Sequence, residues 1–343
     1  MSELNVATIN VRYDRNSREP VPIPHDGPVL PTKRWKDWVE IPWSERRTWL
    51  VDCLLSTGPL DIIGFQEVLH NQLRDLQDLL GDTYRHVGVG RDDGKTAGEY
   101  SPIFYDRTQF EELGWRTIWL SKTSDVPGSK DWDANLTRIA TFLCLRRIWD
   151  GGLIHVINTH YDDMGKRARA ESSYIIREEA EAYFRAVESG LELRRDAPAT
   201  AIVLLGDFNS PPSEAGYGNI SSPDPVPSGK PSYTFTDAYT QLRTRSGISL
   251  SPRQSAPYGP ESTYSTFGRP GSSEAARIDF VFLGQKPSQT VVSENGKTKA
   301  HWVATRYACL DNSVWGEVSG WKGRWSDHRA VRVKLELQVT GEI

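Results

Sequence analysis

The stretch VLLGDFNSPP, residues 203–212, constrains the fold more than any other part of the sequence. It begins as an apolar run typical of a buried strand and leads directly into Asp207, Asn209 and two prolines. A buried carboxylate is costly unless it binds a metal or accepts hydrogen bonds. The stretch therefore predicts a buried strand that ends at a polar cleft.

Polar side chains flank other strand-like runs in the same way. They are Asn10 in TINVRYD, Glu67 in GFQEV, His160 in VINTHYD, Asp279 in RIDFVF, and Asp327 with His328 in SDHRAV. Each has an ordinary explanation when taken alone, such as a turn former for an asparagine or a helix cap for an aspartate. Strand ends that converge on one cleft explain all of them together.

Strand-like runs alternate with helical patterns along the chain. Strands are predicted at 4–11, 61–68, 101–106, 137–148, 153–160, 200–208, 277–284 and 329–337. Helices are predicted at 44–55, with Ser44 as the N-cap, at 71–81, ending at Gly81, and at 166–189. The WDGG turn at 149–152 predicts an antiparallel hairpin, and the class is mixed α/β. The long polar segments 212–233 and 244–273 are predicted to be functional rims or partly disordered.

Composition limits the class of protein. The chain has 343 residues, 38% of them hydrophobic, and no linker-like break, which favours one domain over residues 1–343. A net charge of −4 argues against a surface that coats nucleic acid, although a locally basic cleft stays open. Cys53, Cys144 and Cys309 are far apart, which predicts neither a zinc site nor a disulfide framework.

No apolar run approaches the roughly 18 residues that suggest a membrane span, and the N-terminus lacks the pattern of a signal peptide. A soluble cytoplasmic protein is therefore predicted, with secretion left open if a leader has been replaced. No obligatory protein partner is evident from the sequence.

The joint order of these motifs resembles the endonuclease/exonuclease/phosphatase superfamily, the DNase I-like metal-dependent phosphohydrolases. The resemblance runs from residue 5 to about residue 335 and depends on the Q-E, G-D-F-N and S-D-H motifs. GEYSPIFYD at 98–106 and the segment 118–141 are similar to a bacterial and fungal branch of that superfamily. The resemblance implies a single α/β (α+β) domain, a four-layer sandwich of two mixed sheets packed face to face and flanked by helices.

The resemblance also implies roles for individual residues. Glu67, Asn10 and Asp327 would bind Mg²⁺ or Mn²⁺, hard cations that prefer oxygen ligands. The catalytic set would be His160, Asp207, Asn209, Asp279 and His328. Asp207 would orient or deprotonate the attacking water, and Asn209 would donate to the phosphate. His160 would donate to the phosphate or to the leaving group, and Asp279 would orient His328. Whether Asp207 or His328 is the base stays open.

One position departs from the family. In abasic-site nucleases of the superfamily an acidic residue follows the first-strand asparagine by two positions, whereas this chain has Arg12. That difference favours one metal ion over two, and predicts that Arg12 contacts a substrate phosphate. Arg138 is a second candidate for substrate binding.

Two substrate classes follow from the resemblance. The first is a nuclease or phosphodiesterase acting on nucleic acid, with Trp115, Trp119 and Trp132 as candidates for stacking on bases. The ordinary alternative for these tryptophans is core packing. The second is a phosphatase or phosphodiesterase acting on a small phosphorylated molecule, which the acidic balance of the chain favours. A catalytically inactive binding module is a third hypothesis, and the completeness of the motif set argues against it.

Overall fold

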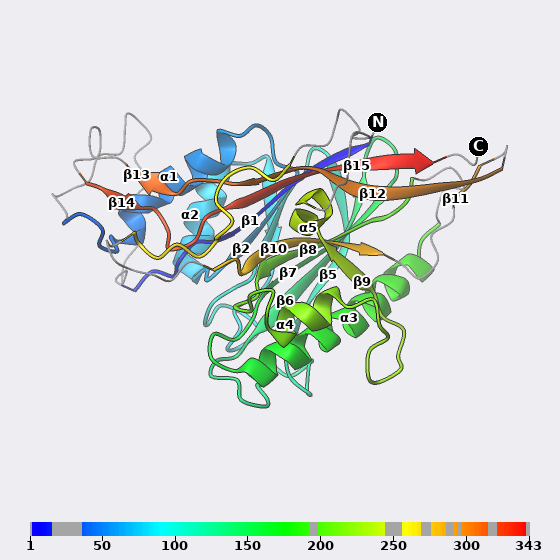
Figure 1. The fold of residues 1–343 in the computed structure, drawn as a ribbon, viewed down its shortest axis with the longest axis horizontal. Helices are drawn as coiled ribbons and strands as arrows, with labels where there is room; N and C mark the ends of the chain where they lie inside the picture. Colours follow the sequence, from blue (N-terminus) through cyan, green and yellow to red (C-terminus); the bar gives the residue numbers. More distant parts are fainter. Residues whose placement is uncertain are drawn as a thin grey trace.

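The computed structural model describes residues 2–15, 36–192, 198–243, 256–268, 276–285, 291–293, 296–314 and 321–340. These residues form two large mixed β-sheets (Figure 1). The seven-stranded sheet has the order β11 (Val291–Ser293), β12 (Gly296–Cys309), β15 (Val331–Thr340), β1 (Glu3–Asn10), β2 (Ile62–Gln66), β4 (Ile103–Asp106) and β3 (Tyr84–Val87).

The six-stranded sheet has the order β5 (Phe110–Trp119), β6 (Ile139–Arg147), β7 (Leu153–His160), β8 (Ala201–Asp207), β10 (Asp279–Gln285) and β9 (Thr234–Asp237). Neighbouring strands are antiparallel except in two central pairs, β1 with β2 and β7 with β8. A short pair, β13 (Ser313–Val314) and β14 (Gly323–Arg324), stands apart. The helices are α1 (Trp43–Leu55), α2 (His70–Leu80), α3 (Lys166–Ser189), α4 (Ala215–Ser221) and α5 (Ala238–Arg243).

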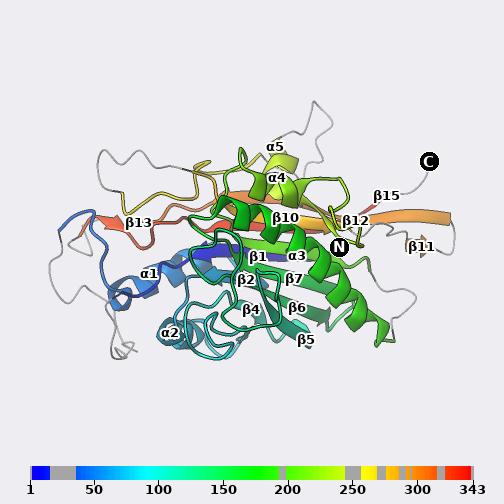
Figure 2. The same ribbon diagram turned by 90° about the horizontal axis from the view of Figure 1, so that it is seen from below.

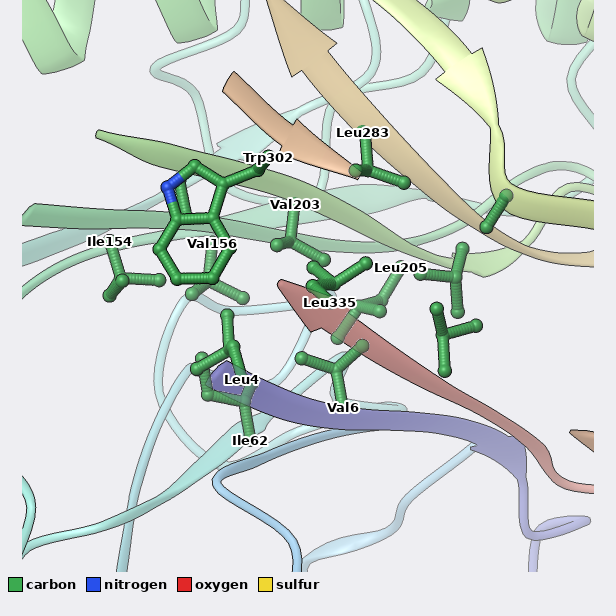
Figure 3. Close-up of a cluster of buried hydrophobic side chains, with 14 of the residues drawn as sticks. Leu4, Val6, Ile62, Ile154, Val156, Val203, Leu205, Leu283, Trp302 and Leu335 are labelled. Carbon is green, nitrogen blue, oxygen red and sulfur yellow. The ribbon is translucent and has the colours of Figure 1, made fainter. Parts of the chain in front are cut away.

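Three apolar clusters divide the molecule into four layers. One lies between the sheets and includes Leu4, Val203 and Trp302 (Figure 3). A second joins the seven-stranded sheet to α1 and α2, and a third joins the six-stranded sheet to α3. In both ribbon views α1 and α2, in blue, lie well apart from α3, in green (Figure 2). The predicted four-layer sandwich is therefore confirmed.

Alternation along the strands directs the polar residues into the space between the sheets. On β8, Val203 and Leu205 pack between the sheets, whereas Leu204 and Phe208 pack on the α3 side. Because successive side chains of a strand point to opposite faces, Asp207 points to the inter-sheet side. Asn10 on β1, His160 on β7 and Asp279 on β10 follow the same rule.

The strand register brings three of these residues into one row. His160 pairs with Asp207 across β7 and β8, and Asp279 pairs with Asp207 across β10 and β8. Directly beneath the site, a buried polar layer joins the two sheets. Gln66 donates to Asn158 Oδ1 at 2.7 Å, and the Asn158 amide donates to the carbonyl oxygens of Phe65 and Pro102, both at 2.8 Å.

The three predicted helices agree with the structure apart from one cap, whereas α4 and α5 were not predicted. Helix α3 spans 166–189 as predicted, and α2 ends at Gly81, whose φ of 72° suits a glycine. Helix α1, however, begins at Trp43 after Pro42 and has no side-chain cap, so the prediction of Ser44 as N-cap is wrong. Proline is pre-organised for helix entry and takes that place.

Several strands were not predicted. Strands β5 and β9 have half-exposed or exposed positions, and β12 carries polar residues throughout its 14-residue length, so none shows a long apolar run. The segment 212–233 contains α4, and 244–255 and 269–275 of the second long segment lie outside the described residues.

Cys53, Cys144 and Cys309 are free thiols. Within the described ranges, no helix is long and apolar enough to cross a bilayer.

Candidate active site

A cavity of about 690 Å³ lies where the polar strand ends converge. Eight of the ten predicted site residues line it: Arg12, Glu67, Arg138, His160, Asp207, Asn209, Asp327 and His328. The other two, Asn10 and Asp279, are fully buried and contact lining residues from behind. The structure thus brings the whole predicted set together from both sheets.

Asp207 lies at the centre of the site and is 1% exposed. Its Oδ2 accepts a hydrogen bond from Asn10 Nδ2 at 2.9 Å, and its Oδ1 accepts one from the backbone N–H of Asn209 at 2.9 Å. Burial, together with the nearby charge of Asp279, raises the pKa of Asp207 to about 7. A carboxyl group with such a pKa can exchange a proton near neutral pH.

His328 is held against two carboxylates. Its Nδ1 lies 2.9 Å from Asp279 Oδ2, and its Nε2 lies 3.7 Å from Asp207 Oδ2. Burial alone would lower the pKa of His328, but Asp279 and Asp207 outweigh it and raise this pKa to about 10. In this arrangement Asp279 fixes the ring, and Nε2 faces the cavity.

His160 is the second histidine of the cavity. Its Nδ1 lies 2.9 Å from a guanidinium nitrogen of Arg138, and its Nε2 lies 3.5 Å from Asp207 Oδ2 and 3.0 Å from the amide nitrogen of Asn209. Burial, with the charges of Arg138 and Arg91, holds the pKa of His160 well below its usual range. The pKa values of the two histidines are therefore shifted in opposite directions although both border Asp207.

Glu67 and Asp327 supply carboxylates on the other side of the cavity. Glu67 Oε1 accepts from Asn10 Nδ2 at 2.9 Å, and Oε2 accepts from the backbone N–H of Tyr13 at 3.0 Å. Burial would raise the pKa of Glu67, but Arg12 and Asn10 outweigh it, and the pKa is lowered. Burial raises the pKa of Asp327. The carboxylate oxygens of Glu67 and Asp327 are donors of the kind that Mg²⁺ and Mn²⁺ prefer, so these residues fit a hard divalent cation.

Asn10 and a cluster of Asp207, Asp279 and His328 are further candidates for binding a metal ion. The amide oxygen of Asn10 accepts from the backbone N–H of Arg12 at 2.9 Å, which leaves it one lone pair. Among the described residues, Asp207, Asp279 and His328 also form a group whose ligand atoms lie within 4.8 Å of one another. The contacts within that group are those of an ion pair.

Arg12 lies among carboxylates. Its Nε donates to Glu40 Oε1 at 3.2 Å, and its guanidinium nitrogens lie 3.8 Å from Glu67 and 3.9 Å from Asp327. The guanidinium also stacks over the ring of Tyr13 at 4.7 Å. A positive charge is therefore held beside the candidate metal ligands. It lies at the position where abasic-site nucleases of the superfamily have an acidic residue.

The sequence analysis missed Glu99, which also lines the cavity. Its Oε2 accepts from Arg91 at 2.7 Å and lies 3.8 Å from both Arg138 and His160. Glu99 lies within the GEYSPIFYD motif, so a test of every acid in the quoted motifs would have found it.

The predicted stacking tryptophans do not form a wall of the cavity. Trp119 is 5% exposed and its indole N–H donates to the carbonyl oxygen of Arg91, while neither Trp115 nor Trp132 lines the cavity. The aromatic rings that do line it are Tyr13 and Tyr264.

The model of the endonuclease/exonuclease/phosphatase family matches residues 7–328. The chain belongs to this family. Members of this family are metal-dependent phosphoester hydrolases. No curated protein matches the chain.

Solved structures of other family members extend over the whole chain. A family protein from Bacteroides vulgatus is 27% identical, with a TM-score of 0.69, and the match covers 98% of this chain and 100% of that one. A mannosyl-6-phosphatase from Bacteroides thetaiotaomicron is also 27% identical, with a TM-score of 0.66 and coverage of 98% and 99%. TDP2 from D. rerio, in complex with single-strand DNA product, is 13% identical, with a TM-score of 0.58 and coverage of 98% and 100%, and shows the shared fold alone.

Proposed function

We propose that this family member hydrolyses a phosphate ester of a small phosphorylated molecule, with Mg²⁺ or Mn²⁺ as cofactor. The observation that carries the proposal is the single cavity in which Asp207, Asn209 and His328 face Glu67 and Asp327. Phosphate-ester hydrolysis needs an activated water, donors to the phosphate oxygens and charge neutralisation, and these residue types supply the protein's part.

Asp207 is our candidate for the base that takes a proton from the attacking water. Asn10 and the Asn209 backbone hold its two oxygens in place, and its carboxylate lies within 4 Å of both histidines. His328, held by Asp279, and the Asn209 amide then donate to the phosphate. A divalent cation on Glu67 and Asp327 would neutralise phosphate charge and stabilise the leaving oxygen. Arg12 would contact a phosphate oxygen from the same side.

Two observations support a small substrate over nucleic acid. Glu99 and Asp163 add negative charge to the cavity wall, which opposes a polyanion. In addition, one of the relatives that are 27% identical over almost the whole chain is a mannosyl-6-phosphatase, whereas the DNA-bound TDP2 is 13% identical. A sugar phosphate or a similar phosphorylated polyol is therefore the substrate class that we propose.

A nuclease or phosphodiesterase is the second candidate. Tyr13 and Tyr264 on the cavity wall, with Arg12, Arg15 and Arg138, favour it, because aromatic rings and arginines bind single strands.

One panel separates the two functions. The protein is freed of metal with a chelator, supplied with Mg²⁺ or Mn²⁺, and assayed on sugar phosphates, nucleotides, single-stranded DNA and RNA. We expect metal-dependent release of phosphate from the sugar phosphates. Cleavage of DNA or RNA without release of phosphate from small esters would establish the second candidate instead. Equal activity with and without metal would overturn both.

A further inference from the structure

Arg138 directs its charge at a histidine. One of its terminal nitrogens lies 2.9 Å from Nδ1 of His160, and the arginine side chain is 6% exposed. A guanidinium has five N–H donors and no acceptor, and it stays protonated in proteins. Nδ1 of His160 can therefore only accept in this contact, so it carries no proton.

The nearby carboxylates bind arginine side chains and make no hydrogen bond to the imidazole of His160. The other terminal nitrogen of Arg138 donates to Asp163 Oδ1 at 3.1 Å. Glu99 lies 3.8 Å from Nδ1 of His160, too far for a hydrogen bond, and it accepts from Arg91 at 2.7 Å. A proton on Nδ1 would place two N–H donors against each other, and an imidazolium protonated on both nitrogens would add a second positive charge beside the guanidinium in a buried site.

We propose that Arg138 is a positioning residue that keeps His160 neutral, with its proton on Nε2. The nearest acceptor to Nε2 is Asp207 Oδ2 at 3.5 Å, while the Asn209 amide nitrogen, 3.0 Å from Nε2, donates to the carbonyl oxygen of Tyr161 at 3.1 Å. His160 is thus a fixed donor through Nε2, and it cannot serve as the base at that nitrogen.

The effect of this tautomer on catalysis rests on the proposed function, but the tautomer itself does not. It can be measured without substrate or metal, by nitrogen-15 NMR of histidine-labelled protein, since the chemical shifts of the two ring nitrogens distinguish the tautomers and the imidazolium. The signal of His160 among the seven histidines is identified by its loss in His160→Gln. We expect the Nε2–H form at neutral pH. An Nδ1–H form or an imidazolium would overturn the proposal.

Substitutions test whether Arg138 is the cause. Lysine is also a donor without acceptor capacity, so Arg138→Lys is expected to keep the Nε2–H form. Glutamine offers an acceptor as well and removes the charge, so Arg138→Gln should release Nδ1 to bind a proton. Arg169→Gln is the matched control, because Arg169 is similarly buried but donates to the backbone carbonyl oxygens of Asp162 and Asp163 and to the carboxylate of Glu214.

Activity provides a second measurement on the same variants. We expect kcat of Arg138→Gln to fall about 10²-fold, as for the loss of one oriented donor, while KM changes little. Retention of the Nε2–H form in Arg138→Gln would overturn the role of Arg138. If the glutamine variant does not fold, the wild-type and Arg138→Lys spectra still decide the assignment. Phosphate release by a protein whose His160 has the other tautomer would leave the proposed function intact and remove this inference.

Discussion

Three residues that line the cavity have positive φ angles, which residues other than glycine rarely adopt. Arg12, Glu67 and Asn209 have φ values of 59°, 60° and 45°. Such conformations cost energy for residues other than glycine, and the surrounding structure has to compensate. The hydrogen bonds from the Arg12, Tyr13 and Asn209 backbone N–H groups to site side chains provide that compensation. Backbone strain therefore coincides with the candidate site at these residues.

At Asp207 the expected effect of substitution is on chemistry. Asp207→Asn keeps the size of the side chain and removes the base, so kcat should fall by roughly 10² to 10⁴-fold. Metal affinity should be close to that of the wild type, because Glu67 and Asp327 are unchanged. Steady-state kinetics and calorimetric titration with Mn²⁺ measure both quantities. Near-normal kcat, or a loss that follows a lowered melting temperature, would contradict the role of Asp207.

At Glu67 the expected effect is on metal binding. Glu67→Gln removes one negative charge and should weaken Mn²⁺ binding by about tenfold or more, since affinity follows ligand charge. Glu40→Gln is the control, because Glu40 also pairs with Arg12 but does not line the cavity. Calorimetric titration of both variants should show weaker binding in the first alone. Unchanged affinity in Glu67→Gln would exclude Glu67 as a ligand.

At the scale of elements, the parallel pair β7 and β8 carries His160 and Asp207 to the same edge. Gly206 precedes Asp207 with a φ of 151°, and a Cβ there would lie 2.3 Å from the carbonyl oxygen of Thr159. The two strands could not keep their distance with any other residue at position 206.

Gly206→Ala should therefore lower the free energy of unfolding by about 1–3 kcal/mol, the range for a strained backbone, and should lower kcat as well. The matched control is Gly218→Ala in α4, where a Cβ meets nothing within 4 Å. Urea unfolding of both variants gives the comparison. Equal stability of the two variants would mean that β7 and β8 can separate without cost.

At the scale of the whole molecule, the buried polar layer joins the sheets beneath the site. Asn158→Ala would leave the carbonyl oxygens of Phe65 and Pro102 and the amide of Gln66 without this partner. The Pro102 carbonyl oxygen still accepts from the Phe65 N–H and Gln66 still donates to Thr8, so each of the lost hydrogen bonds should cost about 0.5–1.5 kcal/mol. Asn219→Ala, which removes one part-buried hydrogen bond to Ala170, is the control. Similar urea midpoints for the two variants would contradict a role of this layer in joining the sheets.

Much of the fold could be predicted because its signals are local. The apolar runs that form β1, β2, β7, β8 and β10 are buried, and their alternation decides which side chains face inward. Strands β5 and β12 lie at or near the edges of their sheets and carry polar residues, so no local pattern revealed them. That residues 1–343 form one domain stays a prediction.

The candidate site also has features that the sequence predicts and features that only the structure shows. The sequence by itself determined most of its members, since residues such as Asn10, His160, Asp207 and Asp279 follow from strand ends and their motifs. Only the tertiary structure decided the partners. That Arg138 meets His160 depends on the pairing of β6 with β7. That Glu99 joins them depends on a loop from the other sheet. The physical reason is that strand periodicity acts within a few residues, whereas the direction of a long charged side chain depends on neighbours that are distant in the chain.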